Sequence, residues 1–256
     1  MRDIRAEIEN INEIVSLPTV LTEIVHELGK EETTTKTLTN LIETDPVLTA
    51  SILRAVNSPF YGLRWRVTNV GNAIGLLGLE ETGKLVLAFF LKQRLFSLTS
   101  GQQAYLELLW NHSINTAHIA HLIAREYHFA SVGKEFTASL LHDMGKIVLA
   151  EYFPTELDTT RRMVRELEQT DIQAEYQIVA TTHTEIGGLL GEKWQLPIDY
   201  LEVMRLHHTP EQAEVEPELT SLVRFADLLS ELWGSGVGEQ PQSTLFYGDE
   251  SYALLS

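Results

Sequence analysis

Apolar residues recur every three or four positions along most of this chain, and this spacing restricts its fold more than any other feature. The first series is Ile4, Ile8, Ile11 and Val15, which falls on one face of a helix. No stretch of useful length alternates between apolar and polar residues, which would be the pattern of a half-buried strand. The sequence therefore predicts an all-α protein.

Proline and glycine residues mark where the helices begin and end. Pro197 and Pro217 stand where a helix starts, because a missing N–H costs little at that position. Gly29 follows the second apolar series and is a natural C-terminal stop. We expect helices over residues 4–15, 17–28, 38–43, 47–56, 103–128, 135–153, 155–168, 172–194, 197–208 and 217–233. Residues 85–96 are strongly apolar, and we expect them to be buried on most sides.

A change in composition at residues 97–101 divides the chain. We expect an N-terminal helical subdomain over residues 1–100 and a second one over residues 101–233. Residues 234–256 are rich in Gly, Ser and Gln and predict a loose tail. The glycines of residues 71–78 are not followed by the Lys-Ser/Thr of a phosphate-binding loop. We expect them to permit close helix packing instead.

The composition excludes several classes of function. Apolar residues make up 44% of the chain and charged residues 21%, which is typical of a globular protein. The absence of cysteine excludes disulfides, thiolate metal sites and a cysteine nucleophile. A net charge of −17 repels phosphate backbones, so we expect no nucleic-acid binding. We interpret the small basic segment Arg64-Trp65-Arg66 as a loop with an aromatic anchor.

No signal for export or membrane insertion is apparent. Residues 1–5 lead into a charged amphipathic segment and lack the apolar stretch of a signal peptide. The longest apolar run, residues 85–91, is far shorter than a bilayer span. We therefore expect a cytoplasmic protein that does not bind membranes.

Most of the histidines lie between His112 and His208. Imidazole and carboxylate groups among apolar residues must be hydrogen-bonded, paired or metal-bound, because a bare buried polar group is costly. A lone histidine is more often a packing residue than a ligand, and we interpret His118, His121 and His128 in that way. The candidate metal ligands are His112, His142, Asp143, His183, His207, His208 and Asp227.

The adjacent pair His142-Asp143 is the centre of this set. On one continuous helix the two side chains would point about 100° apart, so they could serve two metal ions or bridge them. Neutral imidazole and carboxylate suit hard or borderline divalent metals. Lys146 follows one turn later and would hold an anionic phosphate near such a centre.

The order His, His-Asp, His, His-His, Asp resembles the HD superfamily of metal-dependent phosphohydrolases. From Leu17 to Trp233 the chain resembles the HDOD family, the HD-related output domain of bacterial signalling. The motifs that carry this resemblance are Leu17-Pro18, Leu41-Ile42-Glu43-Thr44-Asp45-Pro46-Val47-Leu48, Ser51-Ile52-Leu53-Arg54-Ala55-Val56-Asn57-Ser58, Asn72-Ala73-Ile74, Leu77-Gly78, Trp110-Asn111-His112-Ser113, Leu141-His142-Asp143-Met144-Gly145-Lys146, His183, Trp194-Gln195-Leu196-Pro197 and His207-His208.

The resemblance implies an HD-like helical bundle with an N-terminal helical subdomain. It also implies a cofactor of one or two divalent ions, either Fe, Mn, Zn or Mg. His183, with His207 or His208, would provide the additional ligands of the two-metal branch. The positions of the basic HD metal pattern are occupied by His112, His142, Asp143 and Asp227.

One departure limits what the resemblance implies. Related cyclic-dinucleotide phosphodiesterases carry a Gly-Tyr-Pro element shortly after their paired histidines, whereas Thr209-Pro210-Glu211 follows here. Two functions remain. The first is a signal-transduction module that binds a signalling protein or a small phosphorylated ligand. The second is a metal-dependent phosphohydrolase acting on a nucleotide or phosphoester, with Lys146 at the phosphate. A homodimer through an apolar helix face is compatible with either function.

Overall fold

The structure, a computed structural model, describes residues 19–28, 30, 32–96, 101–129, 134–167 and 169–235. These residues form helices joined by short connections, and no strand occurs among them. The all-α prediction is confirmed. The helix expected over residues 4–15 lies outside the described residues, as does almost all of the tail expected from residue 234. Among the described residues, no helix is long and apolar enough to cross a bilayer.

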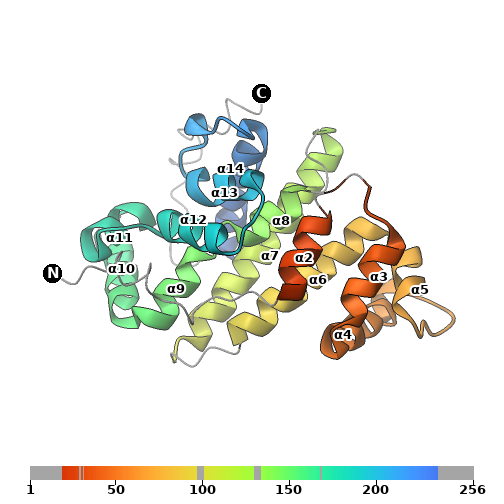
Figure 1. Cartoon of the computed structure of the whole chain (residues 1–256). Coiled ribbons are helices and arrows are strands. Elements are labelled where there is room, and N and C mark those ends of the chain that lie inside the picture. The colour runs from red at the N-terminus through yellow and green to blue at the C-terminus, as the bar shows by residue number, and fades with distance from the viewer. Residues whose placement is uncertain are drawn as a thin grey trace. The chain divides into compact units, whose positions relative to one another are not determined.

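The chain divides into two compact units, one within Ser16–Arg94 and the other within Leu95–Ser256. The N-terminal unit is built around α3, which contacts α2, α4 and α5 (Figure 1). Its core contains the fully buried side chains of Leu21, Leu38 and Ile42. Its helices are α2 (Thr19–Leu28), α3 (Thr35–Glu43), α4 (Pro46–Val56), the short η1 (Pro59–Tyr61), α5 (Val70–Leu77) and α6 (Leu79–Phe96), which crosses into the second unit.

Helix starts in the N-terminal unit follow from side chains that satisfy free backbone N–H groups. The Asp45 carboxylate accepts hydrogen bonds from the backbone N of Val47 (2.8 Å) and of Leu48 (3.0 Å) at the start of α4.

The prediction of close packing at the glycines of residues 71–78 was wrong for two of them. A Cβ at Gly75 or Gly78 would meet no other atom within 4 Å. Gly78 instead adopts φ 85° where α5 ends, a conformation that favours glycine.

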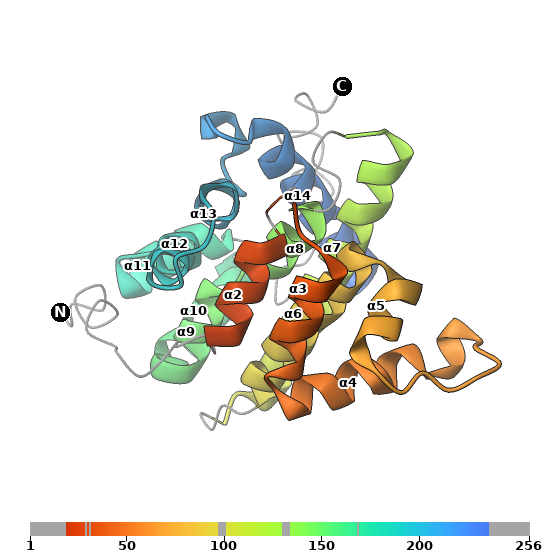
Figure 2. The same ribbon diagram turned by 45° about the vertical axis from the view of Figure 1, so that its right-hand side comes forward.

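The C-terminal unit packs its helices in neighbouring pairs. Helix α7 contacts α8 and α14, and α12 contacts α9 and α13 (Figure 2). The elements are α7 (Gln103–Glu126), α8 (Lys134–Leu141), α9 (Gly145–Tyr152), α10 (Pro154–Leu167), α11 (Asp171–Val179), α12 (His183–Lys193), α13 (Ile198–Leu206), η2 (Pro210–Gln212), α14 (Pro217–Ser230) and η3 (Glu231–Ser235).

The helix predicted over residues 135–153 is broken into α8 and α9. Residues 142–144 form a tight turn in which the backbone N of Met144 bonds the carbonyl of Leu141 at 3.1 Å. Gly145 then begins α9 against α12, where an added Cβ would lie 1.9 Å from the carbonyl oxygen of His183. The His142-Asp143 pair therefore lies on a turn and not on one continuous helix.

The helix predicted over residues 172–194 is also broken, into α11 and α12. Ala180 has φ 55°, a left-handed conformation that ends a right-handed helix. The Thr182 hydroxyl then accepts a hydrogen bond from the backbone N of Glu185 at 3.3 Å and caps α12. His183 is thus the first residue of α12. A single helix over residues 172–194 would have placed His183 on the same face as Tyr176. Tyr176 instead lies on α11, and its side chain is 64% exposed.

Candidate metal centre

The structure brings all seven predicted ligands together in the C-terminal unit, although they come from separate segments. Each is buried except His208, which is half-buried. Their positions are the middle of α7 (His112), the turn between α8 and α9 (His142 and Asp143), the start of α12 (His183), the end of α13 (His207 and His208) and α14 (Asp227).

Asp143 lies between two groups of histidines and turns one carboxylate oxygen to each. Its Oδ2 is 3.5 Å from Nε2 of His142 and 3.6 Å from Nε2 of His112. Its Oδ1 is 3.3 Å from Nε2 of His183 and 3.7 Å from Nε2 of His207. A carboxylate placed in this way can bridge two cations.

Asp227 completes the first group. Its Oδ1 is 3.0 Å from Nε2 of His112 and 3.8 Å from Nε2 of His142. Its other oxygen, Oδ2, accepts a hydrogen bond from Nη1 of Arg224 at 2.9 Å. One possible ligand set is therefore His112, His142 and Asp227, and a second is His183, His207 and His208, with the donor atoms in each set within 4.8 Å of one another.

Hydrogen bonds outside the cluster orient three of the histidine rings. Nδ1 of His183 is 2.8 Å from Oε2 of Glu175, which also accepts a bond from the His183 backbone N at 2.7 Å. Nδ1 of His142 is 2.5 Å from the carbonyl of Ser139, and Nδ1 of His207 is 3.0 Å from that of Val203. A neutral ring that donates from Nδ1 leaves Nε2 unprotonated, so each free nitrogen faces the cluster.

Electrostatic interactions keep the carboxylates of the cluster ionised. Burial alone would raise the pKa of Asp143, but the charges of Lys146 and His142 outweigh it and hold that pKa well below its usual value. Burial would likewise raise the pKa of Asp227, but the hydrogen bond from His112 and the nearby imidazole of His142 lower it. Both carboxylates are thus available as anionic ligands.

The pKa values of the histidines in the cluster are shifted in different directions. Burial lowers the pKa of His142, but the nearby charges of Asp143 and Asp227 raise it more. The pKa values of His207 and His208 are held well below the usual value, mainly by burial and then by neighbouring positive groups. These two rings are therefore neutral, as metal coordination requires.

Lys146 lies beside the cluster but already has two acidic partners. Its Nζ is 3.0 Å from Oδ2 of Asp143 and 2.8 Å from Oδ2 of Asp171. Burial lowers the pKa of Lys146, but these two carboxylates outweigh it, so the pKa is well above its usual value. The ammonium group is charged and paired.

A divalent cation fits the unsatisfied atoms of the cluster. Nε2 of His142 and Oδ1 of Asp143 are buried and have no hydrogen-bond partner, whereas Oδ2 of Asp143 is compensated by Nζ of Lys146 at 3.0 Å. Such atoms are costly unless something else compensates them, and imidazole nitrogen with carboxylate oxygen is a common donor set for Fe, Mn and Zn.

Sequence reasoning did not find the supporting residues Glu175, Asp171 and Arg224. Glu175 lies on α11, one helix before its partner His183. It carries no spacing signal because the break at Ala180 separates the two helices. Of the three histidines interpreted as surface or packing residues, His118 and His128 belong to no candidate ligand group among the described residues, whereas Nδ1 of His121 lies 2.7 Å from Oε1 of the buried Glu135.

The described residues form an all-helical protein with a buried His/Asp cluster. Sequence comparison gives the family to which such a chain belongs. The profile of the HDOD domain matches residues 14–210. The chain belongs to the HDOD family.

Solved structures share this fold. An HDOD domain protein of unknown function from Geobacter sulfurreducens is 25% identical, with a TM-score of 0.80 over 98% of this chain and 85% of that chain. A protein from Shewanella amazonensis SB2B, provisionally named a phosphohydrolase, is 19% identical, with a TM-score of 0.73 over 97% of this chain and 87% of that chain. The second likeness shows the fold alone.

A curated relative extends beyond the matched region. An uncharacterized protein from Treponema pallidum (strain Nichols) is 27% identical over 231 residues. The match covers 86% of this chain but 42% of the relative. The chain therefore corresponds to less than half of that protein.

Proposed function

We propose that this chain is a signal-transduction module whose His/Asp cluster binds one or two divalent cations as a sensing or structural centre. The observation that carries the proposal is the buried carboxylate of Asp143, which turns one oxygen to each histidine group and whose Oδ1 lacks a hydrogen bond. A signalling protein would recognise the metal-bound form of the module, or a small phosphorylated ligand would change it.

The ligands divide into two sets that share Asp143. One ion would be held by His112, His142 and Asp227, and a second by His183, His207 and His208. Histidine-rich sets favour Fe, Mn or Zn over Mg, which prefers oxygen ligands and retains several waters.

Two observations favour sensing over turnover. All the ligands except His208 are buried, which restricts the access of a substrate to the centre. Lys146, the residue expected to hold a substrate phosphate, is instead paired with Asp143 and Asp171. A phosphate would have to displace one of these carboxylates before it could contact the ammonium group.

The alternative is a metal-dependent phosphohydrolase, and the two-sided placement of Asp143 favours it. A pair of divalent ions held there would supply Lewis acidity and lower the pKa of a bound water. The chain's own part would be to orient the histidines through Glu175, Ser139 and Val203 and to exclude bulk water by burial. The provisional name of the Shewanella protein points to the same alternative.

Elemental analysis combined with a phosphoester panel tests the proposal. The purified protein is loaded with Mn, Fe or Zn, dialysed and measured for bound metal beside the variants Asp143→Asn and Asp158→Asn. Asp158 is exposed on α10 of the same unit and serves as the matched control. We expect near-stoichiometric metal in the wild type and the control, and loss of most of it in Asp143→Asn.

The results separate the two functions. Stoichiometric metal without turnover of any phosphoester supports the sensing centre. Metal-dependent turnover that Asp143→Asn abolishes and Asp158→Asn retains would establish the phosphohydrolase instead. If the protein retains no metal under any loading condition, the metal centre itself is refuted.

A further inference from the structure

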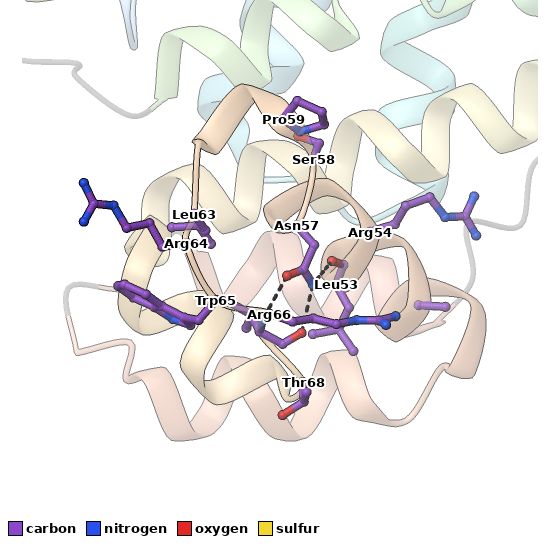
Figure 3. Close-up of a pocket in the computed structure, with 12 residues that line it drawn as sticks. Leu53, Arg54, Asn57, Ser58, Pro59, Leu63, Arg64, Trp65, Arg66 and Thr68 are labelled. Atoms are coloured by element: carbon purple, nitrogen blue, oxygen red, sulfur yellow. Dashed lines mark hydrogen bonds between the residues drawn. The ribbon is translucent and has the colours of Figure 1, made fainter.

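A pocket of about 1120 Å³ lies in the N-terminal unit, which contains none of the candidate metal ligands. It is formed by α4 and the loop of residues 58–68 that follows it (Figure 3). Half-buried Leu53 and Leu63 give it an apolar lining, and Arg54, Arg64 and Arg66 line it with positive charge. The functions considered so far do not use it.

One side chain fixes the shape of this loop. Nδ2 of Asn57 donates to the carbonyl of Leu53 at 2.7 Å and to that of Val67 at 2.8 Å. Its Oδ1 accepts from the backbone N of Val67 at 2.8 Å (Figure 3). Because the far end of the loop is tied back to α4, the pocket is formed before any partner arrives, which lowers the entropy lost on binding.

Among the residues that the structure describes, the arginines of the pocket have no acidic partner. Arg54, Arg64 and Arg66 are exposed, and none of their guanidinium groups forms an ion pair with any residue that the structure describes. This is notable in a chain with 36 acidic residues and a net charge of −17. The pocket is therefore a local positive site on an acidic protein and complements a negatively charged group.

Trp65 stands between two of these arginines and is 63% exposed. The segment is a loop, as expected, but Trp65 is too exposed to anchor it. An exposed tryptophan leaves a large apolar surface in water, and tryptophan and arginine are the residues most enriched among energetic hot spots of protein interfaces. The Arg-Trp-Arg segment thus resembles an interface whose partner is missing.

The arrangement of the charges indicates an extended occupant. Figure 3 shows Arg64 and Trp65 on one side of the pocket and Arg54 on the other. The positive groups do not converge on one point, as they would around a single phosphate. Long nucleic acids meet the repulsion of a chain carrying −17, whereas a short segment engages only the local positive site.

We propose that this pocket docks a short acidic segment of a partner protein. Its carboxylates pair with Arg54, Arg64 and Arg66, and an apolar side chain between them packs on Trp65 and the leucines of the lining. The inference rests on the proposed signalling role only in assuming that a partner protein exists, and it requires no metal.

Fluorescence anisotropy with a defined probe tests this docking site in the 256-residue chain. The probe is a short fluorescein-labelled peptide in which glutamates flank a central pair of leucines. Two comparison probes are the same peptide with glutamine for glutamate and a single-stranded oligothymidylate of similar charge. Binding is measured at about 50 mM and about 200 mM NaCl, which changes the screening length.

The variants are matched by residue type and exposure. Arg64→Ala and Trp65→Ala remove groups of the pocket. Arg162→Ala and Trp233→Ala, exposed in the other unit, remove the same groups elsewhere. We expect the acidic peptide to bind about tenfold more weakly to each pocket variant and without significant change to each control, with weaker binding at the higher salt concentration.

Each other outcome contradicts the proposal in a different way. Failure of the acidic peptide to bind, or binding that the pocket variants leave unchanged, would overturn it. Tighter binding of the oligothymidylate would identify the site as one for nucleic acid. The Asp143→Asn variant should retain peptide binding while it loses metal, so failure of the metal centre and failure of the docking site can be told apart.

Discussion

Glu175 is the residue that most clearly supports the candidate metal centre without being a ligand. Its carboxylate accepts bonds from both the backbone N and the Nδ1 of His183 and is itself buried. The ring of His183 is thereby held with Nε2 toward Asp143 at 3.3 Å. Partners of this kind orient a metal-ligating histidine and increase its basicity.

We therefore predict that Glu175→Gln weakens metal binding. The amide keeps one acceptor oxygen but loses the negative charge that increases the basicity of His183, and the affinity for Zn²⁺ or Mn²⁺ should fall about tenfold or more. Competition with a chromogenic chelator measures this affinity. Glu166→Gln, at an exposed position on α10, should behave as the wild type. Equal affinities for the two variants would show that Glu175 does not orient a ligand.

The contact between α9 and α12 depends on a residue without a side chain. A Cβ at Gly145 would lie 1.9 Å from the carbonyl oxygen of His183 and 2.8 Å from the backbone N of Gly187. Both are main-chain atoms of α12 and cannot move independently of that helix. The same contact sets the position of His183 relative to the turn that carries Asp143.

Gly145→Ala should force α9 and α12 apart. We expect it to lower the free energy of unfolding by about 3 kcal/mol, as overpacking in a rigid core does, and to weaken metal binding. Urea denaturation followed by circular dichroism measures the first effect. Gly75→Ala provides the control, because a Cβ there meets no atom within 4 Å and alanine favours a helix by up to about 1 kcal/mol. A Gly145→Ala protein as stable as wild type would contradict this account of the contact.

The connection from α4 to α5 depends on the hydrogen bonds of one side chain, that of Asn57. Replacing Asn57 with alanine removes its bonds to Leu53 and Val67 and leaves those backbone groups to water. We predict a loss of about 2 kcal/mol and faster amide exchange at Val67, measured by NMR. Asn72→Ala, exposed on α5, should change neither quantity. Unchanged exchange at Val67 would refute the role of Asn57.

The sequence predicted the class and most of the individual helices, but not the two breaks that form the site. Apolar spacing sufficed for α2, α4, α7 and α10. It continued through residues 142–144 and 180–182 because both neighbouring helices bury apolar residues in similar spacing. The breaks follow from tertiary contacts of Gly145 and from the left-handed conformation of Ala180, which no local pattern indicates.

At the scale of the whole molecule, the candidate metal centre and the pocket belong to different compact units. The sequence singled out the seven candidate ligands, which lie together in the structure, because imidazole and carboxylate in apolar surroundings need a partner. It did not indicate the pocket, since Arg64-Trp65-Arg66 has the composition of an ordinary surface loop. What indicates a docking site is the exposure of Trp65 and the lack of ion pairs between the pocket arginines and any described residue.

Hydrogen exchange should show that metal binding affects only the C-terminal unit. We predict that adding Mn²⁺ or Zn²⁺ slows amide exchange in peptides covering residues 139–147, 181–190 and 203–209, because an ion held by these segments opposes their local opening. Peptides covering residues 35–77 should exchange at the same rate with and without metal. The Asp143→Asn variant controls for weak binding at the surface. Protection spread evenly over both units would contradict a centre confined to one of them.

The separation of the ligands along the chain has a consequence for how the protein folds. His112 lies on α7, and the last ligand, Asp227, lies on α14; the nearby pair of Ser230 and His112 is 118 positions apart in sequence. Contacts between distant segments form late, because closing a long loop is entropically costly. A ribosome-bound chain that has not yet released α14 lacks Asp227 from the first ligand set. Capture of an ion by both sets would then mark a chain whose synthesis has passed this helix.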